Sequence, residues 1–287
     1  MIDIGGRRLR LVREGPVGAR PMILLEAGAF GFAADFGVLQ PRLAAEGLHV
    51  LAYDRAGLGL SEPGPKPRDG LAVVADLEAM LEAVGEDGPF VLVGHSMAGL
   101  YLRIFAGRNP EKVAGIVLVD ATTPESVDIP RGRKSIGRFV SATSLAPLAA
   151  LAGIMPLLSF GPMGDKIGLP PEASAEKRRA FRSARHNYWA ALEVGAWWAT
   201  ANQAKVLPSF DPDLPVAVVT AGAGDSHAGF KTVQAAPALA SRHPFIQHVT
   251  GAGHNTLLGP HYAGEVVRAV QNVLAPRAAA PARRISS

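Results

Sequence analysis

Residues 89–107 of this chain read PFVLVGHSMAGLYLRIFAG. The first five residues predict a buried strand and the last eight a helix, so Ser96 lies among small residues at a strand-to-helix junction. A turn this sharp strains the backbone at the serine and admits only small side chains two residues away, here Gly94 and Ala98. It also exposes the Ser96 hydroxyl at the N-terminus of the helix, where developing negative charge is favoured. This pattern is typical of a nucleophile elbow, although a serine in such a loop can also be a simple helix N-cap.

Apolar segments of strand length lie on both sides of this junction. Their hydrophobicity is continuous rather than alternating, which is typical of strands covered on both faces and so of a mostly parallel sheet. We expect strands at residues 10–13, 21–25, 49–53, 89–93, 113–119, 215–220 and 245–249. Apolar residues also recur every three or four positions along two helical stripes, one over residues 71–84 and one over residues 266–274. Alternating strands and helices predict an α/β fold with flanking helices.

The alternation stops between two late strands. We expect residues 1–124 and 207–277 to form the α/β core, residues 125–206 to form an inserted helical cap, and residues 278–287 to form a disordered tail. Within the expected cap, residues 145–160 are almost wholly apolar. They are shorter than the ~20 residues that a membrane-spanning helix needs, and proline and glycine interrupt them. A pair of short helices, buried or forming a lid, is expected there instead.

Composition and charge exclude several classes of protein. Of the 287 residues 48% are hydrophobic, which is ordinary for a globular protein. The formal net charge of +4 is mild and the basic residues are scattered, so we expect no nucleic-acid partner. Cysteine is absent, which excludes disulfide bonds, a thiolate nucleophile and a cysteine-ligated metal. The N-terminus lacks a basic segment followed by an apolar run, so we expect no signal peptide and a cytoplasmic location.

An acidic residue and a histidine follow the two late strands. The loop after strand 215–220 ends at Asp225, and the sequence GAGHN after strand 245–249 carries His254. Carboxyl ends of parallel strands meet at one edge of the sheet, where such folds gather their sites. Because a serine hydroxyl needs a base, and the base needs an orienting acid, Ser96, Asp225 and His254 form a candidate catalytic triad. Asp120 also ends a strand and is the alternative acid, but we favour a structural hydrogen-bonding role for it.

With this order of motifs, the sequence resembles the α/β-hydrolase superfamily, specifically capped serine esterases and lipases with a GHSMAG-type elbow. The resemblance covers about residues 20–125 and 213–275. It implies that Ser96 is the nucleophile, that His254 acts as general base and then general acid, and that Asp225 fixes the tautomer of His254. Alanine at position 98 replaces the second glycine of the commoner motif and is small enough to fit.

The resemblance also implies two backbone N–H groups that stabilise an oxyanion. One is that of Met97, directly after the nucleophile. The other lies in the loop after strand 21–25, where alignment on Ala27-Gly28 selects Ala29 and a slip of one residue would select Phe30. The segment DRAGLGLS at residues 54–61 resembles a family turn, D-x-x-G-x-G-x-S, which we expect to mark the fold without taking part in catalysis.

Aromatic side chains are the candidates for an apolar substrate pocket. Phe30 and Phe32 adjoin the expected oxyanion loop, and Trp189 and Trp197 of the expected cap would lie over Ser96. The cap residues fit equally well as a small core of the cap itself, and four others share that ambiguity: Leu148, Leu151, Met155 and Trp198.

These residues predict a serine hydrolase, without cofactor or metal, that cleaves a small hydrophobic carboxylic ester through an acyl-enzyme intermediate. A carbon–carbon bond hydrolase, a cofactor-free perhydrolase and an aminopeptidase are the alternatives within the same fold. Ser96 argues against epoxide hydrolases and haloalkane dehalogenases, which by the resemblance would carry aspartate there. A non-catalytic protein that binds a small apolar ligand is the alternative from another class, and the formation of a homodimer is left open.

Overall fold

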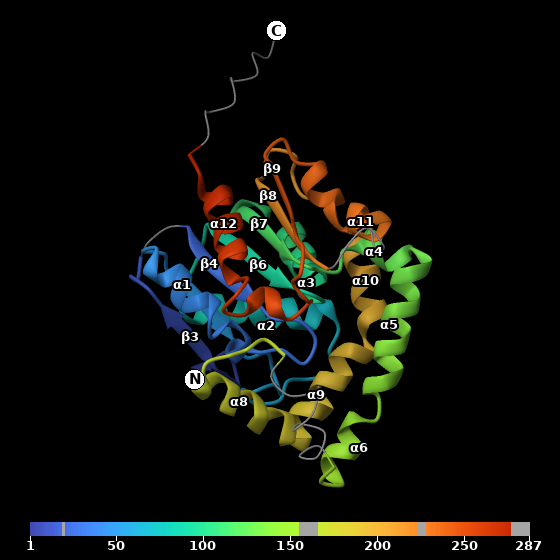
Figure 1. Cartoon of the computed structure of the whole chain (residues 1–287). Helices are drawn as coiled ribbons and strands as arrows, with labels where there is room; N and C mark the ends of the chain where they lie inside the picture. The colour runs from blue at the N-terminus through green and yellow to red at the C-terminus, as the bar shows by residue number, and fades with distance from the viewer. Residues whose placement is uncertain (19–20, 155–165, 223–227, 277–287) are drawn as a thin grey trace, which may run out of the picture.

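A seven-stranded sheet forms the centre of the molecule (Figure 1). The computed structural model describes residues 1–18, 21–154, 166–222 and 228–276. The sheet has the order β3-β5-β4-β6-β7-β8-β9, in which β3 is antiparallel to β5 and every other neighbouring pair is parallel. Its strands are β3 (Leu11–Glu14), β4 (Met22–Glu26), β5 (Val50–Tyr53), β6 (Phe90–His95), β7 (Val113–Val119), β8 (Val216–Ala221) and β9 (Pro244–Val249). The seven predicted strands and the mostly parallel sheet are confirmed.

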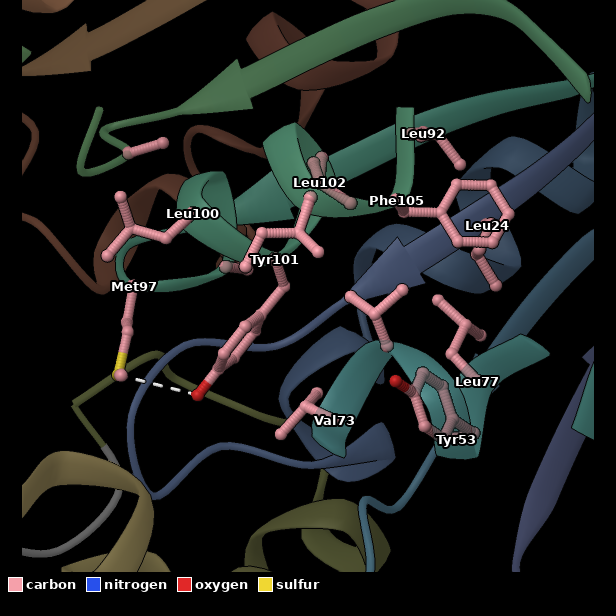
Figure 2. Packing of buried hydrophobic residues seen from close by; sticks show 14 of the residues in the cluster. Leu24, Tyr53, Val73, Leu77, Leu92, Met97, Leu100, Tyr101, Leu102 and Phe105 are labelled. Atoms are coloured by element: carbon pink, nitrogen blue, oxygen red, sulfur yellow. Dashed lines mark hydrogen bonds between the residues drawn. The ribbon is translucent and has the colours of Figure 1, made fainter. Parts of the chain in front are cut away.

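Helices cover both faces of the sheet, so alternate strand residues pack into two separate cores. On one face lie α1 (Leu39–Ala45) and α12 (Ala263–Leu274), packed on the odd-numbered residues of β4 and β6. On the other face lie α2 (Gly70–Ala83), α3 (Ala98–Arg108) and α11 (Ala228–Leu239). Figure 2 shows the second core, where Leu24 and Leu92 of the sheet meet Leu77 of α2 and Phe105 of α3. Burial on both faces is what the continuous apolar runs predict.

Helices make up most of the described chain between β7 and β8, where the sequence predicts an inserted cap. They are α4 (Pro124–Asp128), α5 (Pro130–Thr143), α6 (Ala146–Leu151), α8 (Pro171–Arg182), α9 (Ala184–Gly195) and α10 (Trp197–Lys205). They gather along one side of the sheet and continue beneath it (Figure 1). We call this group of helices the cap.

Two sequence predictions fall partly or wholly on residues that the structure does not describe. In the apolar stretch 145–160, α6 is one short helix of the expected pair. Residues 155–160 lie outside the described residues. The predicted tail at 278–287 also lies outside them. Across the described part of the chain, none of the helices has both the length and the apolar character needed to cross a membrane. A short antiparallel pair, β1 (Ile2–Asp3) and β2 (Arg8–Leu9), precedes the main sheet.

Candidate catalytic site

Ser96 occupies the turn between β6 and α3 in a strained backbone conformation. Its φ of +58° lies in the left-handed region, which residues other than glycine rarely adopt. Two hydrogen bonds hold the turn: the Ser96 N–H donates to the Val119 carbonyl at 3.1 Å, and the Ser96 carbonyl accepts from the Thr122 N–H at 2.8 Å. A Cβ added at Gly94 would lie 2.6 Å from Cδ1 of Leu102 and 3.3 Å from the Cβ of Ala98, so there is little room for a side chain two residues before the serine. The backbone expected for a nucleophile elbow is therefore present.

His254 and Asp120 form a hydrogen-bonded pair beside this turn. The Nδ1–H of His254 donates to Oδ2 of Asp120 at 2.6 Å. Asp120 directly follows β7, has a φ of +42°, and is fixed by its own N–H, which donates to the Val219 carbonyl at 2.7 Å. Burial opposes ionisation of the Asp120 carboxyl, but the hydrogen bond and charge of His254 outweigh it, so the pKa of Asp120 lies below its ordinary value. With Nδ1 protonated, Nε2 of His254 is left as a proton acceptor.

Asp225, the acid that the sequence favours, lies outside the described residues. The carboxylate that contacts His254 is that of Asp120, for which the sequence favours a structural role. β7 and β8 are parallel neighbours in the sheet, so the loops that follow them start at the same edge. Among the described residues, the geometry favours Asp120 as the orienting acid.

His95 supports the loop that carries His254. Its Nε2–H donates to the His254 carbonyl at 2.9 Å, and the two imidazole rings lie 4.5 Å apart between centroids. Burial and the nearby charge of His254 lower the pKa of His95 to about 3, so this ring is neutral near pH 7. The sequence assigns His95 only to the elbow; its second contact, with a residue 159 positions later, has no local sequence signal.

A tight turn brings the predicted oxyanion loop against the serine. The Gly31 N–H donates to the Gly28 carbonyl at 3.0 Å, and Phe30, the third residue of the turn, has a φ of +58°. That hydrogen bond does not use the N–H of Ala29, the second residue. A Cβ added at Gly28 would lie 2.8 Å from the Cβ of Ser96, so the close approach depends on glycine.

Met97 places the second predicted donor on the other side of Ser96. Met97 is the N-cap residue of α3, and the N–H of an N-cap has no partner within its helix. Its side chain is buried, and the hydroxyl of Tyr101 donates to its sulfur at 3.6 Å (Figure 2). Ala29 follows Gly28, which lies close to Ser96, and Met97 follows Ser96 itself; the role of their backbone N–H groups as an oxyanion hole stays a prediction.

A cavity of about 610 Å³ contains these groups and extends into the cap. Ser96, His254 and Asp120 line it on the sheet side. Most of the opposite wall is apolar and comes from the cap: Ile136, Phe139, Ala146, Phe181 and Trp197. An ion pair between Lys177 and Asp35 also borders it. The site therefore combines a polar reactive edge with an apolar chamber.

Two of the four predicted pocket residues line this cavity and two do not. Phe30 and Trp197 border it. The prediction is not met for Phe32, which is wholly buried with its ring 5.4 Å from that of His186, or for Trp189, which packs against Gly57 of the core. Of the remaining candidates, Leu148 and Leu151 are exposed, Trp198 is partly exposed and absent from the lining, and Met155 lies outside the described residues.

Phe139 and Phe181 are cavity residues that the sequence predictions missed. Phe30 contacts both, edge-on with Phe139 at 6.3 Å and stacked with Phe181 at 6.5 Å between ring centroids. A usable signal existed in α5, where Ile136, Phe139 and Thr143 recur at helical spacing and all border the cavity. Over the residues described, no cluster of three or more histidine, aspartate or glutamate side chains suited to a metal ion occurs.

Comparison with known proteins gives one long match and several partial ones. A family model described as the alpha/beta hydrolase family matches residues 23–270. An AB hydrolase superfamily protein of Gibberella zeae is 34% identical over 106 residues, covering 36% of this chain and 33% of that protein. Epoxide hydrolase A of Mycobacterium tuberculosis is 29% identical over 141 residues, covering 48% and 43%. The chain thus spans less than half the length of these curated relatives.

The solved structures resemble the whole chain. A thermophilic esterase from Thermogutta terrifontis superposes with a TM-score of 0.66 at 19% sequence identity, covering 93% of both chains. At that identity the similarity shows the fold alone. The strained serine, the histidine and the carboxylate described above therefore have to carry any conclusion about chemistry.

Proposed function

This chain belongs to the alpha/beta hydrolase family, and we propose that it is a serine hydrolase that cleaves carboxylic esters through an acyl-enzyme intermediate. One observation carries the proposal. Ser96, in its strained turn, shares a cavity with His254, and the Nδ1 of His254 is hydrogen-bonded to Asp120 at 2.6 Å. This is the set of roles that nucleophilic catalysis by serine requires: nucleophile, base and orienting acid.

The first half of the reaction forms the acyl-enzyme. Nε2 of His254 takes the Ser96 proton as Oγ attacks the carbonyl carbon of the ester, giving a tetrahedral oxyanion. The N–H groups of Ala29 and Met97 stabilise that oxyanion, and each such donor is typically worth about 3 kcal/mol of barrier. The carbon–oxygen bond to the leaving group then breaks, and His254 gives its proton to the departing alcohol.

The second half returns the enzyme to its starting state. Water gives a proton to His254 and attacks the acyl carbon, and His254 passes that proton to Ser96 as the acid leaves. Throughout, Asp120 keeps Nδ1 of His254 protonated and stabilises the imidazolium that forms in each half. The lowered pKa of Asp120 keeps this carboxyl ionised at neutral pH.

The cavity supports a hydrophobic substrate. Its apolar chamber of phenylalanine, tryptophan and isoleucine side chains suits a hydrocarbon acyl or alcohol group, and about 610 Å³ lies within the usual range for small-molecule sites. A relative and several structural neighbours are named epoxide hydrolases, but Ser96 stands where the family resemblance places aspartate in those enzymes. Ester hydrolysis is therefore the chemistry that these residues favour.

A fluorophosphonate probe and a series of p-nitrophenyl esters test this proposal together. We expect covalent labelling of the folded protein at Ser96, located by peptide mass spectrometry. We also expect hydrolysis of the esters, with a preference for an acyl-chain length that fits the apolar chamber. Ser96→Ala is the control and should lose both, with turnover falling by about 10⁴-fold or more. Folded wild-type protein that takes no label and cleaves no ester would overturn the proposal and favour a ligand-binding protein.

A further inference from the structure

A buried arginine lies beneath the loop that carries the proposed donor Ala29. Arg55 is only 1% exposed. Its Nη1 donates to the Ala27 carbonyl at 2.6 Å, and its Nη2 donates to the Gly28 carbonyl at 2.8 Å. The guanidinium thus binds two successive carbonyl oxygens immediately before Ala29.

Peptide geometry converts that contact into an orientation of the donor. The Gly28 carbonyl and the Ala29 N–H belong to the same planar trans peptide unit, so they point in opposite directions. By binding the carbonyl oxygen on one side, Arg55 directs the N–H toward the other side of the loop. Gly28 packs against Ser96, which is where an oxyanion would form.

The neighbouring aspartate holds the far end of the same loop. Oδ1 of Asp54 accepts from the Ala33 N–H at 3.0 Å, while its Oδ2 accepts from the Leu60 N–H at 2.9 Å. Asp54 and Arg55 therefore bind opposite ends of residues 27–33. The DRAGLGLS segment, expected to mark only the fold, thus contacts the loop that adjoins the serine.

Two buried carboxylates fix the orientation of Arg55. Glu26 Oε1 accepts from Nη1 at 2.7 Å, and Glu193 Oε2 accepts from Nε at 3.0 Å. Glu26 lies at the end of β4 and is also bound by the Tyr53 hydroxyl at 2.5 Å. Glu193 belongs to α9 of the cap and is fully buried. The cap therefore contributes a partner to the group that orients the oxyanion loop.

We propose that Arg55 is a positioning residue that aims the Ala29 N–H at the oxyanion, and that Glu193 of the cap holds Arg55 in that position. This inference rests on the proposed serine-hydrolase function. A planar guanidinium can bind both carbonyl oxygens and both carboxylates at once, whereas a lysine ammonium in the same place is a single point charge. Arg55→Lys therefore keeps the charge and removes the shape on which the orientation depends.

Steady-state kinetics of Arg55→Lys on p-nitrophenyl butyrate test the inference. An oxyanion donor acts in the transition state, so kcat should fall by about 10- to 100-fold while KM stays within about two-fold. The inhibition constant of an alkyl boronic acid, which forms a tetrahedral adduct with the serine, should weaken by a similar factor. Arg68→Lys is the matched control, because Arg68 is 2% exposed and pairs with Asp76 outside the site; it should change neither kcat nor boronate affinity.

A second variant keeps the test decisive if the first does not fold. Glu193→Gln retains an oxygen acceptor for Arg55 but removes the charge, so we expect kcat to fall about 3- to 10-fold with KM unchanged. A folded Arg55 or Glu193 variant with wild-type kcat and boronate affinity would overturn the inference. So would a loss of activity that merely follows the unfolded fraction measured by circular dichroism. If wild-type protein neither hydrolyses esters nor takes the fluorophosphonate label, the proposed function itself fails, and this inference fails with it.

Discussion

The loops at the sheet edge and the helices of the cap border the same cavity but are constrained in different ways. The loops are fixed by backbone hydrogen bonds to the sheet: Ser96 is bonded to Val119, the last residue of β7, and Asp120 to Val219, two residues before the end of β8. The cap contributes mainly packed side chains, such as Phe139 and Trp197, whose rings lie 5.9 Å apart. We infer that reactivity is set by the sheet edge, together with the buried Arg55–Glu193 pair, and that selectivity is set by the cap side chains that line the cavity. Substitutions in the two regions should therefore have effects of different kinds.

The largest effect is expected from the acid at the sheet edge. Asp120→Asn should lower kcat by about 10⁴-fold, because an amide at this position stabilises the wrong tautomer of His254 and cannot balance an imidazolium. Ester turnover and the rate of fluorophosphonate labelling measure this loss. Asp225→Asn is the matched variant and should retain most of the activity. A greater loss in Asp225→Asn than in Asp120→Asn would show that the acid lies on the loop after β8.

A smaller effect is expected where the oxyanion loop meets the serine. Gly28→Ala would place a Cβ 2.8 Å from that of Ser96 and 3.1 Å from the His95 carbonyl. Because this displaces the loop from Ser96, the proposed nucleophile, we expect kcat to fall about 10- to 100-fold, as for the loss of a well-placed donor. Gly137→Ala is the control, since its Cβ would meet nothing within 4 Å, and it should leave kcat unchanged. Wild-type turnover in Gly28→Ala would mean that the loop has room to adapt.

The sheet edge was largely predictable because its sequence signals are local. Continuous apolar runs located all seven strands within two residues of their observed bounds, and Gly94 before Ser96 has little room for a side chain beside Leu102 and Ala98 of the next helix. The sequence could not decide which aspartate orients His254, because Asp120 and Asp225 both follow strands. Which carboxylate contacts His254 depends on the conformation of two loops, and no local sequence pattern predicts that conformation.

The cap was less predictable because helix periodicity does not say what a face will contact. Trp189 and Trp197 both carry large apolar rings, yet one packs on Gly57 of the core and the other borders the cavity. The contacts of Arg55 could not be predicted either, although it belongs to the recognised DRAGLGLS segment. Its partners Ala27, Gly28 and Glu193 are spread over 167 positions of the chain and become visible only in three dimensions.

The free energy of unfolding should depend on pH through a histidine at the contact between the cap and the core. His186 of α9 accepts from the Gly59 N–H at 3.1 Å, and burial lowers its pKa to about 3 from an ordinary 6.5. Between these values the unfolded chain binds more protons than the native state. The stabilisation is therefore complete above about pH 6.5 and is lost as pH falls toward 3, by at most about 1.4 kcal/mol per pH unit.

Urea unfolding at pH 7 and pH 5 measures this contribution. His186→Gln keeps a hydrogen-bond acceptor but has no titrating group, so its free energy of unfolding should fall less between the two pH values than that of the wild type. His261→Gln, at an exposed position, is the control and should show the wild-type pH dependence. Equal pH dependence in His186→Gln and wild type would show that this histidine does not link protonation to the cap–core contact.

The smallest effect, and the one specific to the cap, is expected from the cavity wall. Phe139 is 39% exposed, so its replacement by alanine should spare the fold while removing an edge-on contact with Phe30 and part of the apolar chamber. KM should rise about 3- to 10-fold for long acyl esters and stay unchanged for the acetate, because each lost methylene contact is worth at most about 0.8 kcal/mol. The kcat values should not change, since Phe139 contacts the ring of Phe30 while hydrogen bonds from Arg55 and within the turn hold the backbone of residues 27–31. Leu148→Ala, on an exposed surface of α6, should behave as wild type. A fall in kcat with every ester would mean that Phe139 acts on the catalytic geometry and not only on the fit of the acyl chain.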